Sequence, residues 1–351
     1  GGIVADAQQA MADFLNAPSA DEIIFGQNMT SLTFHVSRSI GRYFGEGDEI
    51  ILSRMDHDAN VQPWVLLARD CGLNIRWLPF DTETFEFDLE KLGELLNERT
   101  RLVCVGAASN LTGTVNDVEA ICGMARDAGA WSYIDAVQSA PHMVNDVQAF
   151  GCDFLACSPY KFFGPHQGVL WGRREALEAL EPYKLRPAPS EIPWSFAPGT
   201  ASHEGMAGTA AAVEYLAWVG ETMAGGHGDR RQKLRAGMAA IAEYEQGLAE
   251  HLVNGLQSLP GVTIHGITAA EAMSRRGPTV AFTHERHAPE PIARALAARN
   301  IFAWSGHNYA VEVVKSLGLY ESGGVVRVGP VHYNTAAELD RLFEALETIL
   351  T

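Results

Sequence analysis

The sequence predicts an α/β fold: a large domain with a mostly parallel β-sheet flanked by helices, followed by a small C-terminal α/β domain. The main observation is that short β-forming runs alternate with segments of helical periodicity, an order typical of parallel sheets covered on both faces. A chain of 351 residues is also long for one domain, so we expect two. We place them at residues 1–232 and 233–351.

The first half of the chain supplies the elements of the large domain. The expected strands are short apolar runs rich in β-formers, and the expected helices carry apolar residues at helical spacing. Pro63 falls in the first turn of its helix, where proline is tolerated. The strands are 22–25, 49–53, 74–78, 101–106, 131–136, 152–158 and 168–172, and the helices are 3–16, 29–44, 61–69, 89–97 and 118–128.

Composition changes after Arg173. Residues 182–198 are irregular and rich in proline, which indicates a long ordered loop. A helix over 204–219 and a glycine-rich turn at 225–228 follow, and a long amphipathic helix over 233–259 carries the chain into the small domain. There we expect strands at 262–265, 279–283, 302–304 and 325–328, and helices at 291–300 and 336–350.

Charge and cysteine usage disfavour several classes of protein. The net charge is −17, from 26 basic and 43 acidic residues, which disfavours nucleic acid or an anionic membrane as partner. No apolar run approaches the length that spans a bilayer. The five cysteines lie mostly within expected strands and helices, which fits a reducing compartment better than a disulfide framework. We therefore expect a cytoplasmic protein.

Polar side chains follow two neighbouring strands in the stretch 131–173. Asp135 and Gln138 close the first strand, and Ser158 and Lys161 follow the second. An acid at one strand end and a lysine at the next are what a pyridoxal 5'-phosphate (PLP) site needs. A lone aspartate is usually a helix cap and a lone lysine a solvated charge, but the pair in this context is far more specific.

The chemistry of PLP assigns an expected function to each of these side chains. Asp135 keeps a proton on the ring nitrogen, which lets the cofactor withdraw electrons. Lys161 forms the Schiff base with the cofactor aldehyde and later moves the α-proton of the substrate. Gln138 reaches the ring hydroxyl, and Ser158 reaches the phosphate. We thus expect Lys161 and Asp135 to be catalytic.

The motifs D-A-V-Q at 135–138 and S-P-Y-K-F-F-G-P at 158–165 resemble the lysine region of fold-type I PLP enzymes, in the class V aminotransferase group. Within that group the chain resembles cysteine desulfurases and selenocysteine lyases, especially the cysteine desulfurase-like branch. The resemblance covers nearly the whole chain and implies a fold-type I PLP enzyme that acts on an α-amino acid. Relatives carry an N-terminal segment before this point, so we expect it to be absent here or poorly ordered.

The resemblance implies further cofactor contacts in the large domain. Met29 and Thr30 map onto the strand–turn–helix junction that holds the phosphate; the alternative is an ordinary helix cap. His57, within M-D-H-D-A-N, maps onto the histidine that stacks on the pyridine ring and shuttles a proton. Taken alone, Asp-His-Asp suggests a metal site or, more often, a capping cluster. Asn110 maps near the ring hydroxyl, with a turn former before Gly113 as the alternative.

Six expected site residues follow predicted strands, where parallel sheets bind their ligands: Thr30, His57, Asn110, Asp135, Ser158 and Lys161. A dinucleotide site is disfavoured, because no G-x-G-x-x-G follows the first strand and no G-x-x-x-x-G-K-[ST] occurs. Thr200, within F-x-x-G-T, maps onto a threonine that reaches the neighbour's phosphate, so we expect a homodimer with shared sites. Arg327 maps onto the arginine that binds the substrate carboxylate; the alternative is a structural ion pair.

The chain departs from cysteine desulfurases in the segment 304–310, W-S-G-H-N-Y-A. Tyr309 stands where relatives carry the cysteine that takes sulfur from the substrate, and no cysteine follows Cys157. Tyrosine is a poor sulfur acceptor, and Tyr160 also replaces a frequent histidine. We therefore expect a lyase that cleaves a C–S bond by β-elimination, with His307 or Tyr309 as acid or substrate contact.

Two alternatives remain open at this stage. The same cofactor supports a class V aminotransferase or an amino-acid epimerase. The other alternative is a non-catalytic PLP-binding protein that acts as a scaffold, although the joint presence of Lys161, Asp135 and Arg327 argues against it. The sequence does not name the substrate, because specificity lies in the loops 185–196 and 304–309.

Overall fold

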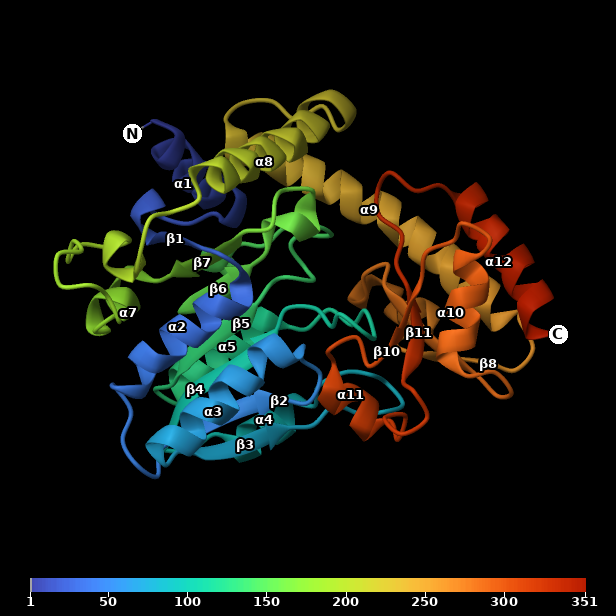
Figure 1. Cartoon of the computed structure of the whole chain (residues 1–351), viewed down its shortest axis with the longest axis horizontal. Helices are drawn as coiled ribbons and strands as arrows, with labels where there is room; N and C mark the ends of the chain where they lie inside the picture. Colours follow the sequence, from blue (N-terminus) through green and yellow to red (C-terminus); the bar gives the residue numbers. More distant parts are fainter. Residues whose placement is uncertain (1) are drawn as a thin grey trace.

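Two β-sheets organise the chain, as the computed structural model of residues 2–351 shows (Figure 1). The first has seven strands in the order β1-β7-β6-β5-β4-β2-β3. Its strands are β1 (Ile23–Gly26), β2 (Glu49–Ser53), β3 (Asn74–Leu78), β4 (Thr100–Gly106), β5 (Trp131–Asp135), β6 (Phe154–Cys157) and β7 (Gly168–Gly172).

Five neighbouring strands of this sheet run in one direction. β3, β2, β4, β5 and β6 pair in parallel, whereas β7 is antiparallel to both β6 and β1. The predicted mostly parallel sheet is therefore confirmed. Because parallel strands end at one edge, the segments after β2, β4, β5 and β6 meet there.

Helices cover both faces of the large sheet. One face packs against α1 (Gly2–Leu15), α5 (Val118–Asp127) and α8 (His203–Met223), and the other against α2 (Met29–Gly41) and α3 (Gln62–Cys71). The strand pleat divides the two cores: Ile51 belongs to the first, whereas Ile50 and Leu52 belong to the second. Such alternation follows from the two-residue period of a strand. Shorter helices α4 (Leu89–Leu95), α6 (Val147–Phe150) and α7 (Arg174–Ala179) complete this part.

Helix α9 (Arg230–Gln257) leads to the second sheet (Figure 1). Asp229 and Gln232 form a capping box that fixes its first turn. The second sheet is antiparallel, in the order β10-β11-β9-β8. Its elements are β8 (Val262–His265), β9 (Val280–His284), β10 (Trp304–Gly306) and β11 (Val325–Val328), with α10 (Pro289–Ala297), α11 (Val311–Ser316) and α12 (Ala336–Leu350).

The second sheet also has two packed faces. α9, α10 and α12 enclose one core with Val280, Phe282 and Val326. The opposite core joins Ala281 and Val325 to α11 and to loops of the first sheet. The predicted boundary between residues 232 and 233 falls inside the continuous helix α9 and stays a prediction. None of the helices within residues 2–351 is long and apolar enough to cross a bilayer.

Several details differ from the expected elements. β10 begins at Trp304 rather than at residue 302, because Trp304 is the first residue to pair with β11, and Phe302 is 86% exposed. Helices α6, α7 and α11 were not expected, and none has more than six residues. In α11 only Val313 and Val314 are buried, so packing rather than periodicity defines this helix.

Candidate active site

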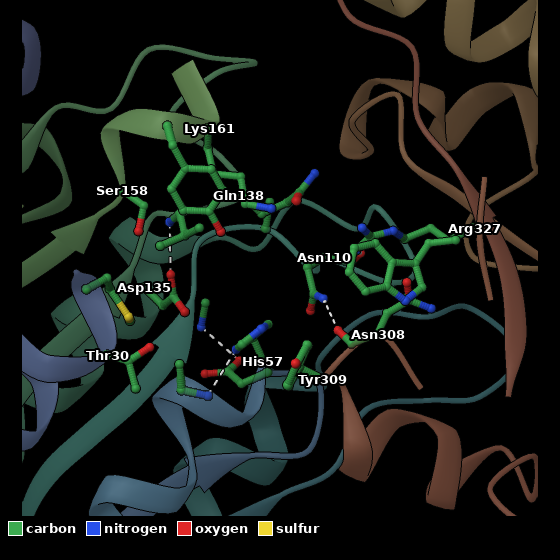
Figure 2. A pocket seen from close by; sticks show the side chains of 18 residues that line it. Thr30, His57, Asn110, Asp135, Gln138, Ser158, Lys161, Asn308, Tyr309 and Arg327 are labelled. Carbon is green, nitrogen blue, oxygen red and sulfur yellow. Dashed lines mark hydrogen bonds between the residues drawn. The ribbon is translucent and has the colours of Figure 1, made fainter. Parts of the chain in front are cut away.

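A cavity of about 240 Å³ lies where the parallel strands of the first sheet end and the β10–α11 loop approaches (Figure 2). Its walls come from both halves of the chain. Eighteen residues line it: Met29, Thr30, Asp56, His57, Ala59, Gly106, Ala108, Asn110, Asp135, Val137, Gln138, Ser158, Tyr160, Lys161, Trp304, Asn308, Tyr309 and Arg327. The structure thus brings together ten of the twelve expected site residues.

Asp135 is the last residue of β5, and its carboxyl is buried at the cavity wall. Its Oδ1 accepts a hydrogen bond from the Val137 N–H at 2.9 Å. The pKa of Asp135 is raised to about 7, chiefly by burial and in part by the Asp56 charge, while the Val137 N–H and Lys161 oppose the shift. A buried acid with this proton affinity is suited to share a proton with a basic ring nitrogen.

Lys161 lies on the short 3₁₀ helix η3 (Pro159–Phe162), which follows β6 directly. Pro159 occupies the first turn of η3, and the Lys161 N–H donates to Ser158 O at 2.9 Å. The ammonium lies 5.1 Å from the centre of the Tyr160 ring. Burial lowers the pKa of Lys161, Arg327 lowers it further, and Asp135 opposes both. The neutral amine, which is the nucleophilic form of a lysine, is therefore more populated at a given pH than it is in water.

His57 begins the 3₁₀ helix η2 (Asp58–Asn60) after β2. Its Nδ1 accepts a hydrogen bond from the Ala59 N–H at 3.0 Å, so the ring proton of the neutral form is on Nε2. Burial lowers the pKa of His57 to about 4, and the Lys161 and Arg327 charges add to this. The Tyr309 ring stacks on His57, with 5.3 Å between centres and 26° between planes.

The N-terminus of α2 opens into the same cavity. Asn28 caps this helix by accepting from the Ser31 N–H at 2.8 Å, and Met29 and Thr30 line the cavity. The first N–H groups of a helix have no partner within it, and the helix dipole makes that end attractive to anions. Ser158 lies at the cavity wall with no cap bond to its own helix.

Asn110 connects the two halves of the cavity. Its side-chain Nδ2 donates to the backbone oxygen of Asn308 at 2.7 Å, and its backbone oxygen accepts from Arg327 Nη1 at 2.8 Å. Because the Asn308 oxygen can only accept, the amide nitrogen must point toward it, and the side-chain Oδ1 points the other way. That oxygen is buried and has no partner within residues 2–351. A buried acceptor without a donor indicates that a ligand supplies one.

Arg327 lies on β11, and burial lowers its pKa. Within residues 2–351 no carboxylate lies within ion-pair distance of its guanidinium, so the structure does not support the alternative of a structural ion pair. A partly buried guanidinium without an anion is suited to bind a carboxylate. Gln138 lines the cavity while its Nε2 donates to Thr279 Oγ1 at 2.9 Å.

Two expected residues lie outside the cavity. His307 is exposed, and its Nδ1 accepts from the Tyr309 N–H at 3.0 Å, so its side chain supports the Tyr309 backbone instead of lining the site. Thr200 is exposed and borders a different groove with Gln27 and Ser31. Its expected contact with a neighbour's phosphate stays a prediction.

Eight lining residues were not among the expected site residues, and four of these carry polar or aromatic side chains: Asp56, Tyr160, Trp304 and Asn308. The first two lie beside His57 and Lys161 in the sequence, which was a usable signal. Trp304 and Asn308 belong to the loop 304–309 that we expected to carry specificity, but their individual places depend on the pairing of β10 with β11, which puts this segment opposite Asn110. No cluster of three potential metal ligands occurs within residues 2–351, at Asp56, His57 and Asp58 or elsewhere.

Comparison with known proteins gives consistent results. The family model of class V aminotransferases matches residues 2–342. The cysteine desulfurase of Yersinia pestis (strain Pestoides F) is 31% identical over 353 residues, which cover 97% of this chain and 80% of the relative. The structure of the Escherichia coli cysteine desulfurase CsdA covers 99% of this chain and 84% of its own, with a TM-score of 0.87 and 27% identity. That of the enzyme from Thermococcus onnurineus NA1 has a TM-score of 0.88 and 28% identity.

The chain therefore belongs to the class V aminotransferase family, whose members depend on PLP. The fold is that of cysteine desulfurase structures, which confirms the predicted fold-type I architecture. The residues that line the cavity also fit the cofactor independently of these comparisons. The cavity combines a buried acid, a lysine amine without a hydrogen-bond acceptor among the described residues, a helix N-terminus and the unpartnered Asn110 Oδ1.

Proposed function

We propose that this protein uses PLP to cleave the C–S bond of an α-amino acid by β-elimination, without a loop cysteine. One observation carries the proposal. The cavity joins Lys161, Asp135 and Arg327, and none of its eighteen lining residues is a cysteine. Cys104, Cys122, Cys152 and Cys157 are buried elsewhere, and burial raises the pKa of each. No reactive thiolate is therefore placed to accept sulfur.

Different residues of the cavity bind different parts of the cofactor. When bound, the cofactor supplies an electron sink for the bond broken at Cα. Asp135 holds the proton at the ring nitrogen, and Met29, Thr30 and Ser158 hold the phosphate beside the α2 N-terminus. Gln138 and Asn110 contact the ring hydroxyl, for which the unpartnered Asn110 Oδ1 is the acceptor. The neutral His57 ring covers the cofactor face and excludes water.

Three residues handle the substrate. Arg327 binds its carboxylate through the two-pronged guanidinium. The Lys161 amine accepts the proton from Cα, because burial and Arg327 favour its neutral form. Tyr309 lies over His57 at the mouth of the cavity, where its phenol donates a proton to the departing sulfur. His307 acts on this step only through the Tyr309 backbone.

Assembly and location form a second part of the proposal. Thr200 is exposed and lies outside the chain's own cavity, which supports a homodimer in which it reaches the neighbour's phosphate. A molar-mass measurement in solution should give twice the chain mass, and a monomer would contradict the proposed homodimer. All five cysteines are free thiols, which supports a reducing compartment such as the cytoplasm.

Borohydride trapping tests the proposal at its first step. The holoenzyme is reduced with borohydride, digested and mapped, and the pyridoxyl group should be on Lys161. Lys161→Ala should abolish the label and lower turnover of sulfur amino acids by about 10³-fold or more. Lys91→Ala is the matched control, because Lys91 is exposed and pairs only with Glu94. A label on another lysine, or full activity of Lys161→Ala, would contradict the proposal.

A further inference from the structure

Asp56 is a second buried carboxylate in the cavity, and the proposed function does not use it. It lies between the end of β2 and His57 and is 4% exposed. It also lines the cavity. Isolated carboxylates are rarely buried, because removing their charge from water is costly. This acid therefore needs an explanation beyond packing.

Three donors hold the Asp56 carboxylate. Oδ1 accepts from Ser53 Oγ and, at 2.8 Å, from the Gly106 N–H, while Oδ2 accepts from Asn60 Nδ2 at 2.7 Å. The Asn60 orientation is fixed in turn, because its Oδ1 accepts from Trp64 Nε1 at 3.1 Å. All three groups are donors, so the network is built for the anion.

The same network places Asp56 beside the acid that faces the cofactor. Gly106 ends β4 and pairs with Asp135 in the neighbouring strand β5. The next residue, Ala107, donates its N–H to Asp135 O at 2.8 Å. A β-carbon on Gly106 would lie 3.3 Å from Asp56 Oδ1, so glycine permits this close approach. The two carboxyls thus flank one strand end.

We propose that Asp56 is a positioning residue that acts through Asp135: its negative charge, fixed by Ser53, Asn60 and Gly106, holds the proton on the Asp135–cofactor pair. The inference rests on the proposed function of Asp135. A negative charge beside a buried acid raises the proton affinity of that acid, and the Asp56 charge raises the pKa of Asp135. Loss of the Asp56 charge removes a negative charge from beside the Asp135–cofactor pair and lowers the proton affinity of both its members, so the cofactor ring nitrogen loses its proton at lower pH.

The ionisable groups around the pair support this assignment. Burial raises the pKa of Asp56 to about 6, and its three hydrogen bonds oppose the shift. From β4, the Cys104 thiol faces Asp56, and burial raises its pKa well above the usual range, so it stays neutral. From η3, Lys161 lowers the pKa of Asp135. His57 is neutral, because its pKa is lowered to about 4.

Carboxyl carbon-13 NMR of the cofactor-free protein, labelled at aspartate, tests the charge coupling directly. In the wild type, Asp56 and Asp135 should each show two inflections with shared midpoints, because they titrate as a coupled pair. In Asp56→Asn the Asp135 midpoint should fall by about one pH unit. Asp58→Asn is the matched control in the same turn, and it should leave the midpoint in place, because Asp58 faces Glu312 and Lys315.

The holoenzyme provides the second readout. With nitrogen-15 in the PLP ring, Asp56→Asn should lose the protonated-nitrogen signal at lower pH than the wild type. Asp56→Glu keeps the charge and should bring this transition most of the way back to the wild-type pH. Independent single titrations in the wild type, an unchanged Asp135 midpoint, or an equal shift in Asp58→Asn would overturn the inference. The wild-type titration decides the matter even if Asp56→Asn does not fold. If the two aspartates titrate as a coupled pair but the protein binds no PLP, the proposed function is refuted while the coupling of Asp56 to Asp135 stands.

Discussion

The backbone at Asn308 and Tyr309 adopts left-handed conformations, with φ of 51° and 59°. Such conformations cost about 1 kcal/mol or more for residues other than glycine. Two contacts with the first half of the chain offset this cost: Asn110 Nδ2 donates to Asn308 O, and the Asp58 N–H donates to Tyr309 O, both at 2.7 Å. The Tyr309 ring is thereby held against His57, although 57% of the residue is exposed.

Tyr309→Phe separates the phenol from the ring. The variant keeps the stacking on His57 and should bind the substrate with an unchanged dissociation constant. It should eliminate sulfur about 10²-fold more slowly, because a general acid contributes at least that factor. Steady-state kinetics of pyruvate release check this, with Tyr320→Phe as the control at a tyrosine outside the cavity lining. An unchanged turnover number would assign the proton donation to another group.

The His57 imidazole should stay neutral from about pH 8 down to about pH 5. Burial lowers its pKa to about 4, with Lys161 and Arg327 contributing, so protonation begins only below that range. The neutral ring should carry its proton on Nε2, because Nδ1 accepts the Ala59 N–H. Nitrogen-15 NMR of labelled histidine in the cofactor-free protein measures both properties. A titration midpoint above pH 6 would contradict the described environment.

At the scale of elements, several segments were predictable to the residue. The strands 49–53, 74–78, 168–172, 262–265 and 325–328 and the helix 336–350 agree with the structure at both ends. In α12 the reason is local, because Thr335 and Glu338 form a capping box before a strongly amphipathic stretch. Helix α11 lacks such signals: no side chain caps its N-terminus, and it exists because α11 packs against Ala281 and Val325.

The contact between α8 and α9 depends on two facing glycines. A β-carbon on Gly220 would lie 1.8 Å from Lys233 O, and one on Gly237 would lie 2.5 Å from Leu216 O. Gly220→Ala should therefore lower the free energy of unfolding by about 1–3 kcal/mol or more, because backbone atoms must move apart. Chemical denaturation of the cofactor-free protein measures this.

Gly247→Ala is the control on α9, the partner helix that carries Gly237. Nothing lies within 4 Å of its added β-carbon, so the substitution should raise stability by about 0.5–1 kcal/mol through helix propensity. Equal effects of the two substitutions would show that the helices do not meet as closely as described.

At the scale of the whole molecule, the site is assembled from two sheets that are far apart in sequence. The first-sheet residues could be predicted, because they follow strand ends and strand ends of a parallel sheet converge. Asn308 and Trp304 could be predicted only as members of the specificity loop 304–309, since their place depends on how β10 and β11 meet the Asn110 loop. Arg327 was found only through the family resemblance, and its contact with the Asn110 carbonyl is a tertiary property.

This assembly explains why a loop without cysteine still closes the site. Asn110 and Asp58 fix the Asn308–Tyr309 backbone, and Arg327 approaches from the adjoining strand. In the proposed function, Arg327 and Tyr309 on this unit handle the substrate carboxylate and the departing sulfur, while Lys161 and Asp135 act from the large sheet. The account requires sulfur to leave as sulfide, because no thiol lines the cavity.

The product formed from L-cysteine tests that requirement most directly. Purified protein loaded with PLP is given L-cysteine, and alanine, pyruvate, ammonia and sulfide are quantified together, with Lys161→Ala as the blank. The account predicts pyruvate, ammonia and sulfide in equal amounts and no alanine. Alanine with persulfide would contradict it and show that desulfuration proceeds without a cysteine at position 309. If neither set forms while the cofactor spectrum responds to other amino acids, C–S cleavage gives way to transamination or epimerisation.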